Sequence, residues 1–451
     1  MTFAEFKQEF FAQAKAKGFT DYEILFRGSN GFSVRVLNGE ITEYKSTASQ
    51  GVGFRGTYNG KMGYAASEKM DASVIEPMLA NAAANASIIE DESVEKLYPG
   101  DESYPNVYAY NPMLNDTAAA DKIKWAKEME AYAKSLDPRV KMADFCTIGN
   151  QETEMAMANS YGLDLSQKNN MASAFITARV EEGGKTKSAY EYWNGRDFAD
   201  FDYKTLAKKA VDTAISYLGA TSIETGAYPI VFDNNTTKDL FSVFSGIFMA
   251  ENAQKGFSLL SKDKIGTEIA APHINLRDDG VCDLSLGSMA FDAEGVATQQ
   301  KAVIENGVLK TLLYNLKSAE KDGVKSTGNA SKAGLGGAIA TSCTNFYLVP
   351  SETSFDELIS DVEKGVVITK MAGLHSGVNP VSGDFSVSAD GFLVENGKIC
   401  KPVEQITVAG NFYEVLKNIQ AVGSDLRFHS SGQGGIGMPS ILVDGLTVSG
   451  L

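Results

Sequence analysis

Residues 373–411 read GLHSGVNPVSGDFSVSADGFLVENGKICKPVEQITVAGN and carry the clearest strand pattern of the chain. Apolar and polar side chains alternate within 385–395 and 404–409, as they do in strands that bury one face. Between these runs lies Glu395-Asn396-Gly397, and an Asn-Gly pair favours the positive φ angles of a tight hairpin turn. Glycine-rich turns precede the first run. The segment therefore predicts antiparallel strands packed in a sheet.

The rest of the C-terminal half, assigned as one domain over 223–451, shows the same texture. An apolar strand is predicted at 228–232, and the capping residues Asn234-Asn235-Thr236-Thr237 introduce a helix over 237–254. Short strands separated by Gly and Asn turns follow, and a last helix is expected at 413–420. The predicted strands lie at 274–276, 289–291, 299–305, 311–315, 342–348, 385–395, 404–409, 440–444 and 447–448. This half is predicted to be mainly β.

The N-terminal half is predicted to contain two α+β units, at 1–110 and 111–222. Each unit has a helix, a meander of short strands and a second helix. The first has helices at 3–17 and 71–89 around strands at 22–27, 32–37, 41–46, 51–58 and 61–66. The second has helices at 117–135 and 203–217 around strands at 140–147, 152–159, 164–168, 172–182 and 185–194. A polar linker is expected at 90–112. Either an internal duplication or two unrelated units explains the pattern, and the fold class is α+β.

Composition limits the classes of function. The net charge of −16 disfavours direct contact with the phosphates of nucleic acids. The most apolar stretch, 240–250, is far shorter than the roughly 20 residues that span a bilayer, so no membrane association is expected. The N-terminus reads as an amphipathic helix and not as a secretion signal, which predicts a cytoplasmic protein. Four widely spaced cysteines fit reduced thiols in that compartment.

Few residues suggest a metal site of the chain's own. The three histidines, His273, His375 and His429, are far apart in sequence, so no helix carries a pair of histidine ligands. Convergence of the three in space would make a hydrolase with an unconventional site. The glycine-rich run at 431–437 fits either a nest for an anion or a tight loop, because no helix is predicted behind it.

Four segments, in this order, resemble the TldD/PmbA family, also known as modulators of DNA gyrase. They are NGEITEYKSTASQGVGFRGTYNGKMGYAAS (38–67), GVNPVSGDFS (377–386), FLVENGKICKPVEQITVAGN (392–411) and PSILVDGLTVSG (439–450). The resemblance extends over nearly the whole chain. It implies an α+β N-terminal region and a mostly β C-terminal domain, in agreement with the patterns above.

The resemblance also implies which residues replace a metal motif. Catalytic members carry His-Glu-x-x-x-His on a helix at the start of the C-terminal domain, and a cysteine near the chain end completes a zinc site. The matching positions here are Phe241, Ser242 and Gly246, and the region of the cysteine reads His429-Ser430-Ser431. Phenylalanine and glycine side chains have no ligand atoms. No catalytic residue, metal or cofactor is therefore expected in this chain.

This pattern resembles the PmbA/TldE branch, whose members pair with a TldD chain that supplies the zinc. We therefore expect a non-catalytic subunit of a cytosolic zinc metallopeptidase that degrades or processes small unfolded peptides. The resemblance implies a heterodimer with a TldD-type subunit and allows a homodimer in its absence. The alternatives are a stand-alone regulatory protein related to toxin–antitoxin systems or gyrase, and a hydrolase with an unconventional site.

Four residues in glycine-rich loops are the expected lining of a cleft shared with the partner, since functional residues concentrate in such loops. They are His375, Asn379, Asp384 and His429. Turn formation and surface capping are the structural alternative for these side chains.

Overall fold

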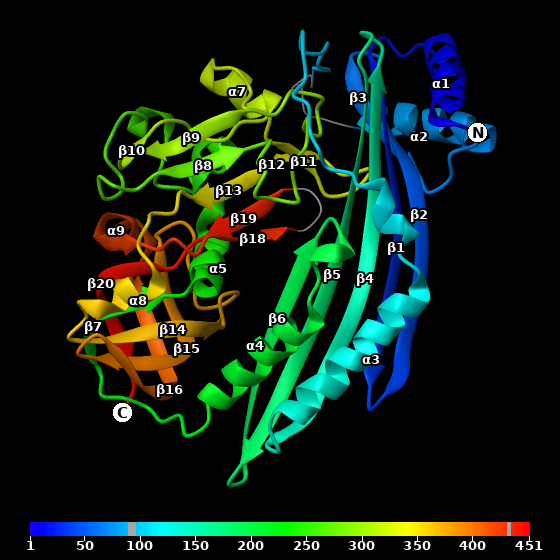
Figure 1. Ribbon diagram of the computed structural model, residues 1–451. Helices are drawn as coiled ribbons and strands as arrows, with labels where there is room; N and C mark the ends of the chain where they lie inside the picture. Colours follow the sequence, from blue (N-terminus) through cyan, green and yellow to red (C-terminus); the bar gives the residue numbers. More distant parts are fainter. Residues whose placement is uncertain (89–95, 431–433) are drawn as a thin grey trace.

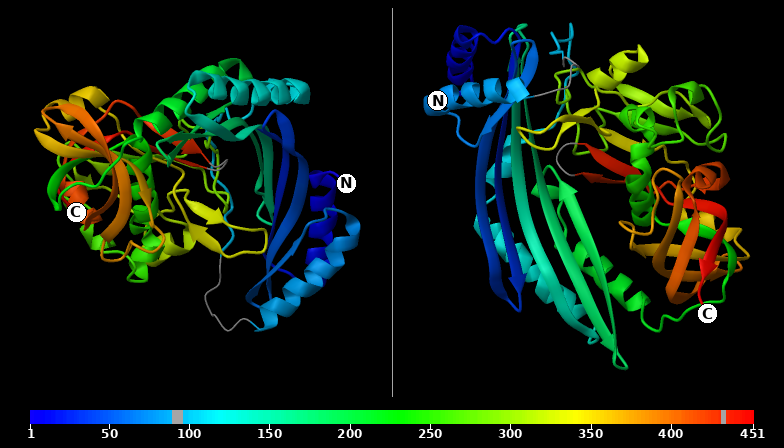
Figure 2. Two further views of the ribbon diagram at one scale, coloured as in Figure 1. Left: turned by 90° about the horizontal axis from the view of Figure 1, so that it is seen from below. Right: turned by 180° about the vertical axis from the view of Figure 1, so that it is seen from behind.

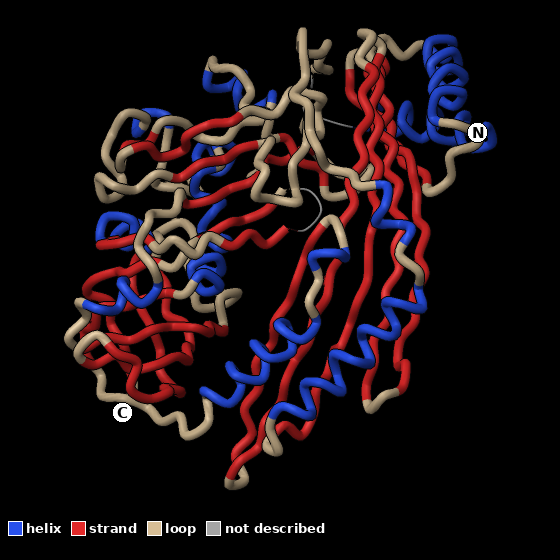
Figure 3. The backbone as a smooth tube through the Cα atoms, viewed as in Figure 1, coloured by secondary structure: helices blue, strands red, loops and turns tan. Residues whose placement is uncertain are grey.

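The computed structural model of this protein describes residues 1–88, 96–430 and 434–451. A long curved sheet and four helices form the N-terminal half, and the C-terminal half lies beside one face of this sheet (Figures 1 and 2). Strands dominate the C-terminal half, where the helices are short (Figure 3). The predicted α+β class is confirmed. Among the described residues, no helix combines the length and the apolar character that a membrane crossing requires.

The N-terminal half contains six strands in one antiparallel sheet of order β3-β2-β1-β4-β5-β6. Its helices are α1 (Phe3–Lys17), α2 (Ile75–Ile88), α3 (Ala119–Leu136) and α4 (Tyr203–Ser216), with short 3-10 turns η1 (Ala72–Val74), η2 (Pro112–Asp116) and η3 (Phe198–Asp200). Its strands are β1 (Tyr22–Leu37), β2 (Glu40–Tyr58), β3 (Lys61–Ser67), β4 (Val140–Asn159), β5 (Asp164–Glu182) and β6 (Lys185–Gly195).

The sequence predicted ten short strands in this half. The structure has six strands, of which four are long, and the difference has one physical cause. The sequence predicted a break around Gly28–Gly31, but this stretch pairs on both sides: Asn30 lies opposite Ala48 of β2 and Glu152 of β4. Backbone hydrogen bonds to two neighbouring strands hold residues that alone would favour a turn. The Asn-Gly hairpins are confirmed, since Asn38 has φ 53° and Gly39 φ 78°.

The sheet is symmetric in its strand order about the central β1–β4 pair. Each side has a helix, three antiparallel strands and a helix, in the order in which the chain supplies them. The even-numbered residues Ile24 and Val34 of β1 face the two helix pairs, because Ile24 packs with α1 and α2 and Val34 packs with α3 and α4. All four helices therefore cover one face of the sheet. A duplicated unit gives this arrangement, and the boundary between the two predicted units runs through one continuous sheet.

The C-terminal half contains two six-stranded sheets and a two-stranded hairpin. Its strands are β7 (Gly226–Phe232), β8 (Leu276–Asp279), β9 (Gln300–Glu305), β10 (Val308–Leu309), β11 (Ala330–Lys332), β12 (Ile339–Thr341), β13 (Asn345–Leu348), β14 (Lys364–Ala372), β15 (Asp384–Glu395), β16 (Lys398–Asn411), β17 (Ile419–Val422), β18 (Arg427–Ser430), β19 (Gly435–Met438) and β20 (Ile441–Ser449). Its helices are α5 (Asn234–Phe244), α6 (Ala250–Gln254), α7 (Leu316–Asp322), α8 (Phe355–Ser360) and α9 (Phe412–Asn418), with 3-10 turns η4 (Ser245–Phe248) and η5 (Lys262–Lys264).

One of these sheets closes into a small barrel. Its order is β16-β15-β14-β7-β20-β17, and β16 also pairs with β20, which joins the two sides. The stretch at 373–411 supplies β15 and β16, and the Asn396-Gly397 hairpin between them is confirmed by positive φ angles of 50° and 72°. Helix α5 lies between this barrel and the other sheet, β10-β9-β8-β13-β19-β18 (Figure 1). Both sheets and α5 share one hydrophobic core.

Several predicted elements of this half are corrected. The predicted helix at 237–254 is interrupted after η4, where Met249 is extended and Ala250 donates a backbone hydrogen bond to the Leu313 carbonyl. The strands predicted at 289–291 and 311–315 are single bridges instead. The last two predicted strands are one, β20, because its residues pair with β7 on one side and with β16 and β17 on the other.

The free face of the long sheet contacts the C-terminal half near one end. Leu25, Met155 and Met157 of β1 and β4 pack with Phe291, and the Arg27 guanidinium donates to the Lys332 carbonyl at 2.7 Å. The segment predicted as a linker takes part in this contact. In its described part, Tyr104 Oη donates to the Gly295 carbonyl at 2.8 Å, and the Asp101 carboxylate accepts from the Ala297 N–H at 2.8 Å. The two halves are therefore joined by apolar packing and by hydrogen bonds.

Candidate functional site

Of the three positions matched to the metal motif, Phe241 lies in the hydrophobic core, and Ser242 and Gly246 are partly buried beside it. Phe241 is 1% exposed and contacts the Phe412 ring edge-on, with 5.1 Å between the ring centroids. Phe244 stacks on the same Phe412 ring, with 4.5 Å between centroids. Ser242 Oγ donates to the Lys238 carbonyl at 2.6 Å, which occupies its hydroxyl within the helix. The Gly246 carbonyl accepts from Asn252 Nδ2 at 2.8 Å. These residues do not fit a zinc ion, because they offer aromatic carbon and hydrogen-bonded oxygens where imidazoles are required.

His429 lies between the two halves of the molecule. It belongs to β18, and its Nδ1 is 2.7 Å from the Tyr192 hydroxyl of β6, with the two rings 5.0 Å apart. Burial, together with the positive charges of Lys238 and Arg427, lowers the pKa of His429 to about 3. The imidazole is therefore neutral at physiological pH and bound to a tyrosine. Ser431, next in the region matched to the family's cysteine, lies outside the described residues, as do 432 and 433 of the glycine-rich run.

The other three predicted cleft residues lie together in the connection from β14 to β15. His375, Asn379 and Asp384 are exposed. The Asn379 side chain accepts from the N–H of Val381 and of Ser382, which is turn formation. Asparagine 411 and the Ser382 hydroxyl donate to the Asp384 carboxylate and lower its pKa. His429 is on a different sheet, so the structure groups three of the four candidates and leaves the fourth apart.

No set of three or more His, Cys, Asp and Glu side chains suited to hold a metal ion occurs within residues 1–88, 96–430 and 434–451. His273 is exposed in a loop. Three of the four thiols are buried or partly buried, and burial raises the pKa of Cys146, Cys282 and Cys343, which disfavours the thiolate that metal binding requires.

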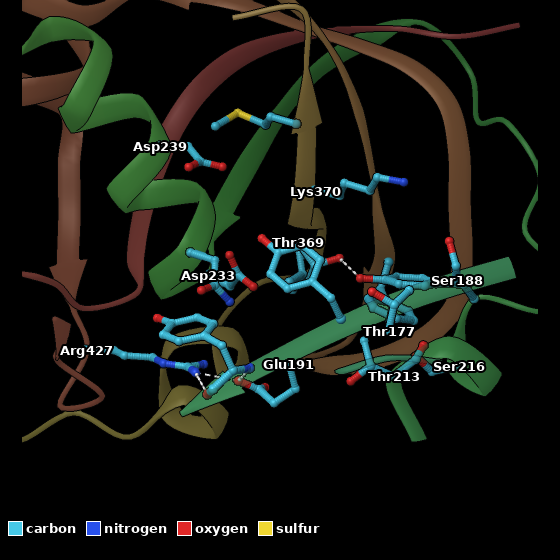
Figure 4. A pocket seen from close by; sticks show the side chains of 18 of the residues that line it. Thr177, Ser188, Glu191, Thr213, Ser216, Asp233, Asp239, Thr369, Lys370 and Arg427 are labelled. Atoms are coloured by element: carbon cyan, nitrogen blue, oxygen red, sulfur yellow. Dashed lines mark hydrogen bonds and ion pairs between the residues drawn. The ribbon is translucent and has the colours of Figure 1, made fainter. Parts of the chain in front are cut away.

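A cavity of about 460 Å³ opens between the edge strand β6, the end of α4 and the closed barrel (Figure 4). Tyr190 and Tyr192 of β6 form one wall, and Tyr217 and Phe392 form another. Helix α5 points its first turn into this space, because Asp233 is its N-cap and precedes it directly. None of the four residues predicted for a cleft is among the described residues that line the cavity. His429 touches it only through Tyr192.

The acidic side chains of the cavity come mainly from the first two turns of α5. Asp233 Oδ1 accepts from the Thr236 N–H at 2.8 Å and from the Thr236 hydroxyl at 2.7 Å. Burial raises the pKa of Asp233 to about 6, against the lowering effect of these hydrogen bonds. Asp239 lies one and a half turns further along, paired with Lys238. Figure 4 shows both carboxylates on the same side of the cavity.

An ion pair also lines the cavity. The Arg427 guanidinium pairs with Glu191 and donates to the Tyr192 carbonyl at 2.8 Å. Its central carbon lies 4.0 Å from the centroid of the Tyr192 ring, which is a cation–π contact. The dashed lines beside Arg427 in Figure 4 mark the bonds of this group. The sequence patterns missed these residues, because β6 and β18 are more than 200 positions apart. The only local signal was the capping run that follows Asp233.

Comparison with known proteins gives three matching domain families that together span most of the chain. They are described as PmbA/TldA metallopeptidase domain 1, central domain and C-terminal domain, at residues 22–86, 113–218 and 225–450. The Metalloprotease PmbA of Escherichia coli O157:H7 is 27% identical over 77% of this chain and 73% of its own length.

Two crystal structures share the fold over the whole chain. A candidate modulator of a DNA gyrase from Thermotoga maritima is 33% identical, with a TM-score of 0.90, and the match covers 99% of this chain and 100% of that one. TldE from Thermococcus kodakarensis has a TM-score of 0.90 at 22% identity over 99% of this chain and 100% of its own. At that identity the second match speaks for the fold alone.

Proposed function

This chain belongs to the PmbA/TldA metallopeptidase family, and on that premise we propose that it is the non-catalytic, PmbA/TldE-type subunit of a zinc metallopeptidase. Its partner is a TldD-type chain that carries the zinc and the general base. The complex degrades or processes small unfolded peptides in the cytosol. The role of this chain is to complete the chamber and to help hold an extended peptide.

The observation that carries the proposal is the packing of Phe241. Where catalytic relatives place a metal ligand, this side chain is 1% exposed and lies against Phe412 in a core of aromatic rings. A core of this kind excludes water and offers no lone pairs, so a hydrolytic zinc site there would require the core to be rebuilt. The nearest charged side chains on the same helix, Lys238 and Asp239, are paired with each other.

Two further observations support a role in peptide handling. Strand β6 is the edge of the long sheet and lies along the cavity, where an extended peptide can add as a further strand. The neutral His429 is hydrogen-bonded to Tyr192, and among the described residues no second imidazole lies beside it. The site is therefore suited to binding better than to activating a water molecule.

The test compares this chain, a TldD-type chain and their mixture on a short unstructured peptide with a fluorescent reporter. We expect cleavage to rise strongly in the mixture and to be absent with this chain alone. Chelation should abolish the cleavage, and added zinc should restore it. Size-exclusion chromatography of the mixture checks the expected heterodimer and distinguishes it from a homodimer of this chain.

Metal analysis of the purified chain gives an independent readout. We expect far less than about one zinc per chain, because a structural or catalytic site requires three or four protein ligands. Tight retention of one zinc together with cleavage by this chain alone would mean that it is itself the hydrolase. No cleavage and no co-elution with the TldD-type chain would favour a stand-alone regulatory protein.

A further inference from the structure

The cavity between β6 and the barrel is lined by an acceptor that lacks a donor and by a carboxylate. Asn235 Oδ1 is buried and has no hydrogen-bond partner among the described residues. Its neighbour Asp233 is a partly buried carboxylate, and no described lysine or arginine forms an ion pair with it. A buried acceptor without a donor costs about 1–3 kcal/mol. A ligand whose N–H group donates a hydrogen bond to this acceptor would remove that cost.

The walls of the cavity are aromatic as well as acidic. Tyr217 stacks on Phe392 at 5.5 Å between ring centroids, and its hydroxyl is 2.8 Å from Thr369 Oγ1. Tyr190, on the opposite wall, stacks on Phe175 at 5.6 Å. Aromatic faces next to a carboxylate attract organic cations, because the ring quadrupole and the anion act in the same direction.

The protein already holds one guanidinium in this way in the lining of the cavity. Arg427 combines an aromatic face, Tyr192, with a carboxylate, Glu191, and a backbone carbonyl. Its charge is thereby balanced. Lys370, the other cation of the lining, is more than half exposed and lies 3.8 Å from Asp390. Among the described residues, neither of the two cations that line the cavity forms an ion pair with Asp233.

We propose that this cavity binds the cationic side chain of a peptide, a lysine or an arginine, between Tyr190, Tyr217 and Phe392 and against Asp233 and Asn235. The guanidinium or ammonium donates to the Asp233 carboxylate and to Asn235 Oδ1. The inference deepens the proposed function and rests on it for the peptide as the source of the cation. It gives the subunit a part in substrate selection: peptides with a basic residue are held along β6.

Calorimetric titration of the purified full chain tests this directly. The probe is a short Gly/Ser peptide with blocked ends and one central arginine. Its matched control carries citrulline, which has the same shape without the charge. We expect the arginine peptide to bind roughly ten- to a hundredfold more tightly, which is the range for hydrogen bonds to a charged group. A lysine peptide should follow the arginine peptide, and methylguanidinium should compete with both.

Two variants locate the site. Asp233→Asn keeps an N-cap residue of similar quality and removes the charge, so the fold should persist while the preference for arginine over citrulline is lost. The matched control is Asp202→Asn, the same change at the N-cap of α4, where the side chain is exposed outside the cavity. We expect this control to bind like the wild type. Asn235→Ala should weaken arginine binding with Asp233 intact.

Equal binding of the arginine and citrulline peptides would overturn the inference, and so would an Asp233→Asn variant that retains the preference. If methylguanidinium bound and neither peptide did, the inference would also be contradicted, because the ligand would then be a free small cation. The assay uses this chain by itself. Failure of cleavage with a TldD-type partner therefore counts against the proposed function and not against this site. Failure of peptide binding counts against this site and not against the proposed function.

Discussion

The imidazole of His429 illustrates how neighbours decide the chemistry of a single residue. Its ring packs on Tyr192, and the nearby charges, Lys238 and Arg427, are positive. A histidine in this setting keeps its neutral form well into the acidic range, because a proton would bring a third cation into a partly buried space.

This setting gives a prediction for the titration of His429. His429 should show no titration in an NMR experiment between about pH 8 and about pH 5, where an ordinary histidine titrates. Because the unfolded chain binds a proton near pH 6.5 and the folded chain does not, the free energy of unfolding should fall as pH decreases below about 6.5. His429→Gln should reduce this fall. A midpoint near 6.5 for His429 would contradict the geometry of the site.

Phe241 gives a second prediction at the same scale. Phe241→Ala removes a ring that is 1% exposed and should lower the free energy of unfolding by about 3–5 kcal/mol, since a cavity forms in a packed core. Urea denaturation measures the loss. Phe257→Ala is the matched control, because Phe257 is 56% exposed, and it should change stability by less than about 1 kcal/mol. Equal losses of stability in the two variants would show that Phe241 does not contribute to the core.

At the scale of elements, close packing of helix on sheet depends on small residues. Gly63 of β3 lies directly under α2, and a Cβ atom at this position would be 1.9 Å from the Ala82 carbonyl oxygen. No flexible side chain there can move aside, because the obstacle is helix backbone.

Gly63→Ala should therefore push α2 away from the sheet and destabilise the protein by about 1–3 kcal/mol. Thermal unfolding followed by circular dichroism measures the change. Gly334→Ala provides the comparison, since a Cβ atom there meets nothing within 4 Å. A Gly63→Ala variant as stable as Gly334→Ala would show that α2 adjusts without cost.

At the scale of the whole molecule, the two halves share a group of buried charges. Arg55 pairs with Glu23 inside the long sheet, at 2.8 Å. Asp292, from the C-terminal half, accepts backbone hydrogen bonds from Glu294, Val296 and Ala330. Glu294 accepts a backbone hydrogen bond from the Leu316 N–H at 2.8 Å. Burial raises the pKa of Glu294, and the neighbouring Asp292 raises it further.

The folded protein therefore holds the proton of Glu294 more tightly than the unfolded chain, whose glutamates titrate near 4.5. The contribution of Glu294 to stability is therefore fully present below this value and is lost as pH rises towards the alkaline range. Glu294→Gln should flatten the dependence of the melting temperature between about pH 5 and about pH 8. The matched control is Glu320→Gln, at an exposed glutamate, and it should leave the wild-type slope unchanged. An identical slope in all three proteins would show that Glu294 is ionised in the fold.

Much of the local structure is predictable from sequence. The Asn-Gly pairs specify hairpins because asparagine and glycine tolerate positive φ. The capping run after Asp233 signals a helix, but α5 begins at Asn234 with Asp233 as its N-cap, three residues before the predicted start. Strand length is not predictable in this way. The glycines around residues 28–31 favour a turn when considered alone, and only pairing with β2 and β4 makes them part of β1.

The sequence by itself determined the α+β class, the family and the absence of ligand atoms at Phe241 and Gly246, since side-chain chemistry needs no coordinates. Only the tertiary structure decided that both N-terminal units form one sheet, that β16 closes the barrel onto β20, and that Asp233, Tyr217 and Arg427 meet around one cavity. The reason is the range of the interactions. Capping and turn formation act over a few residues, whereas strand register and cavity walls join residues hundreds of positions apart and depend on how whole faces pack.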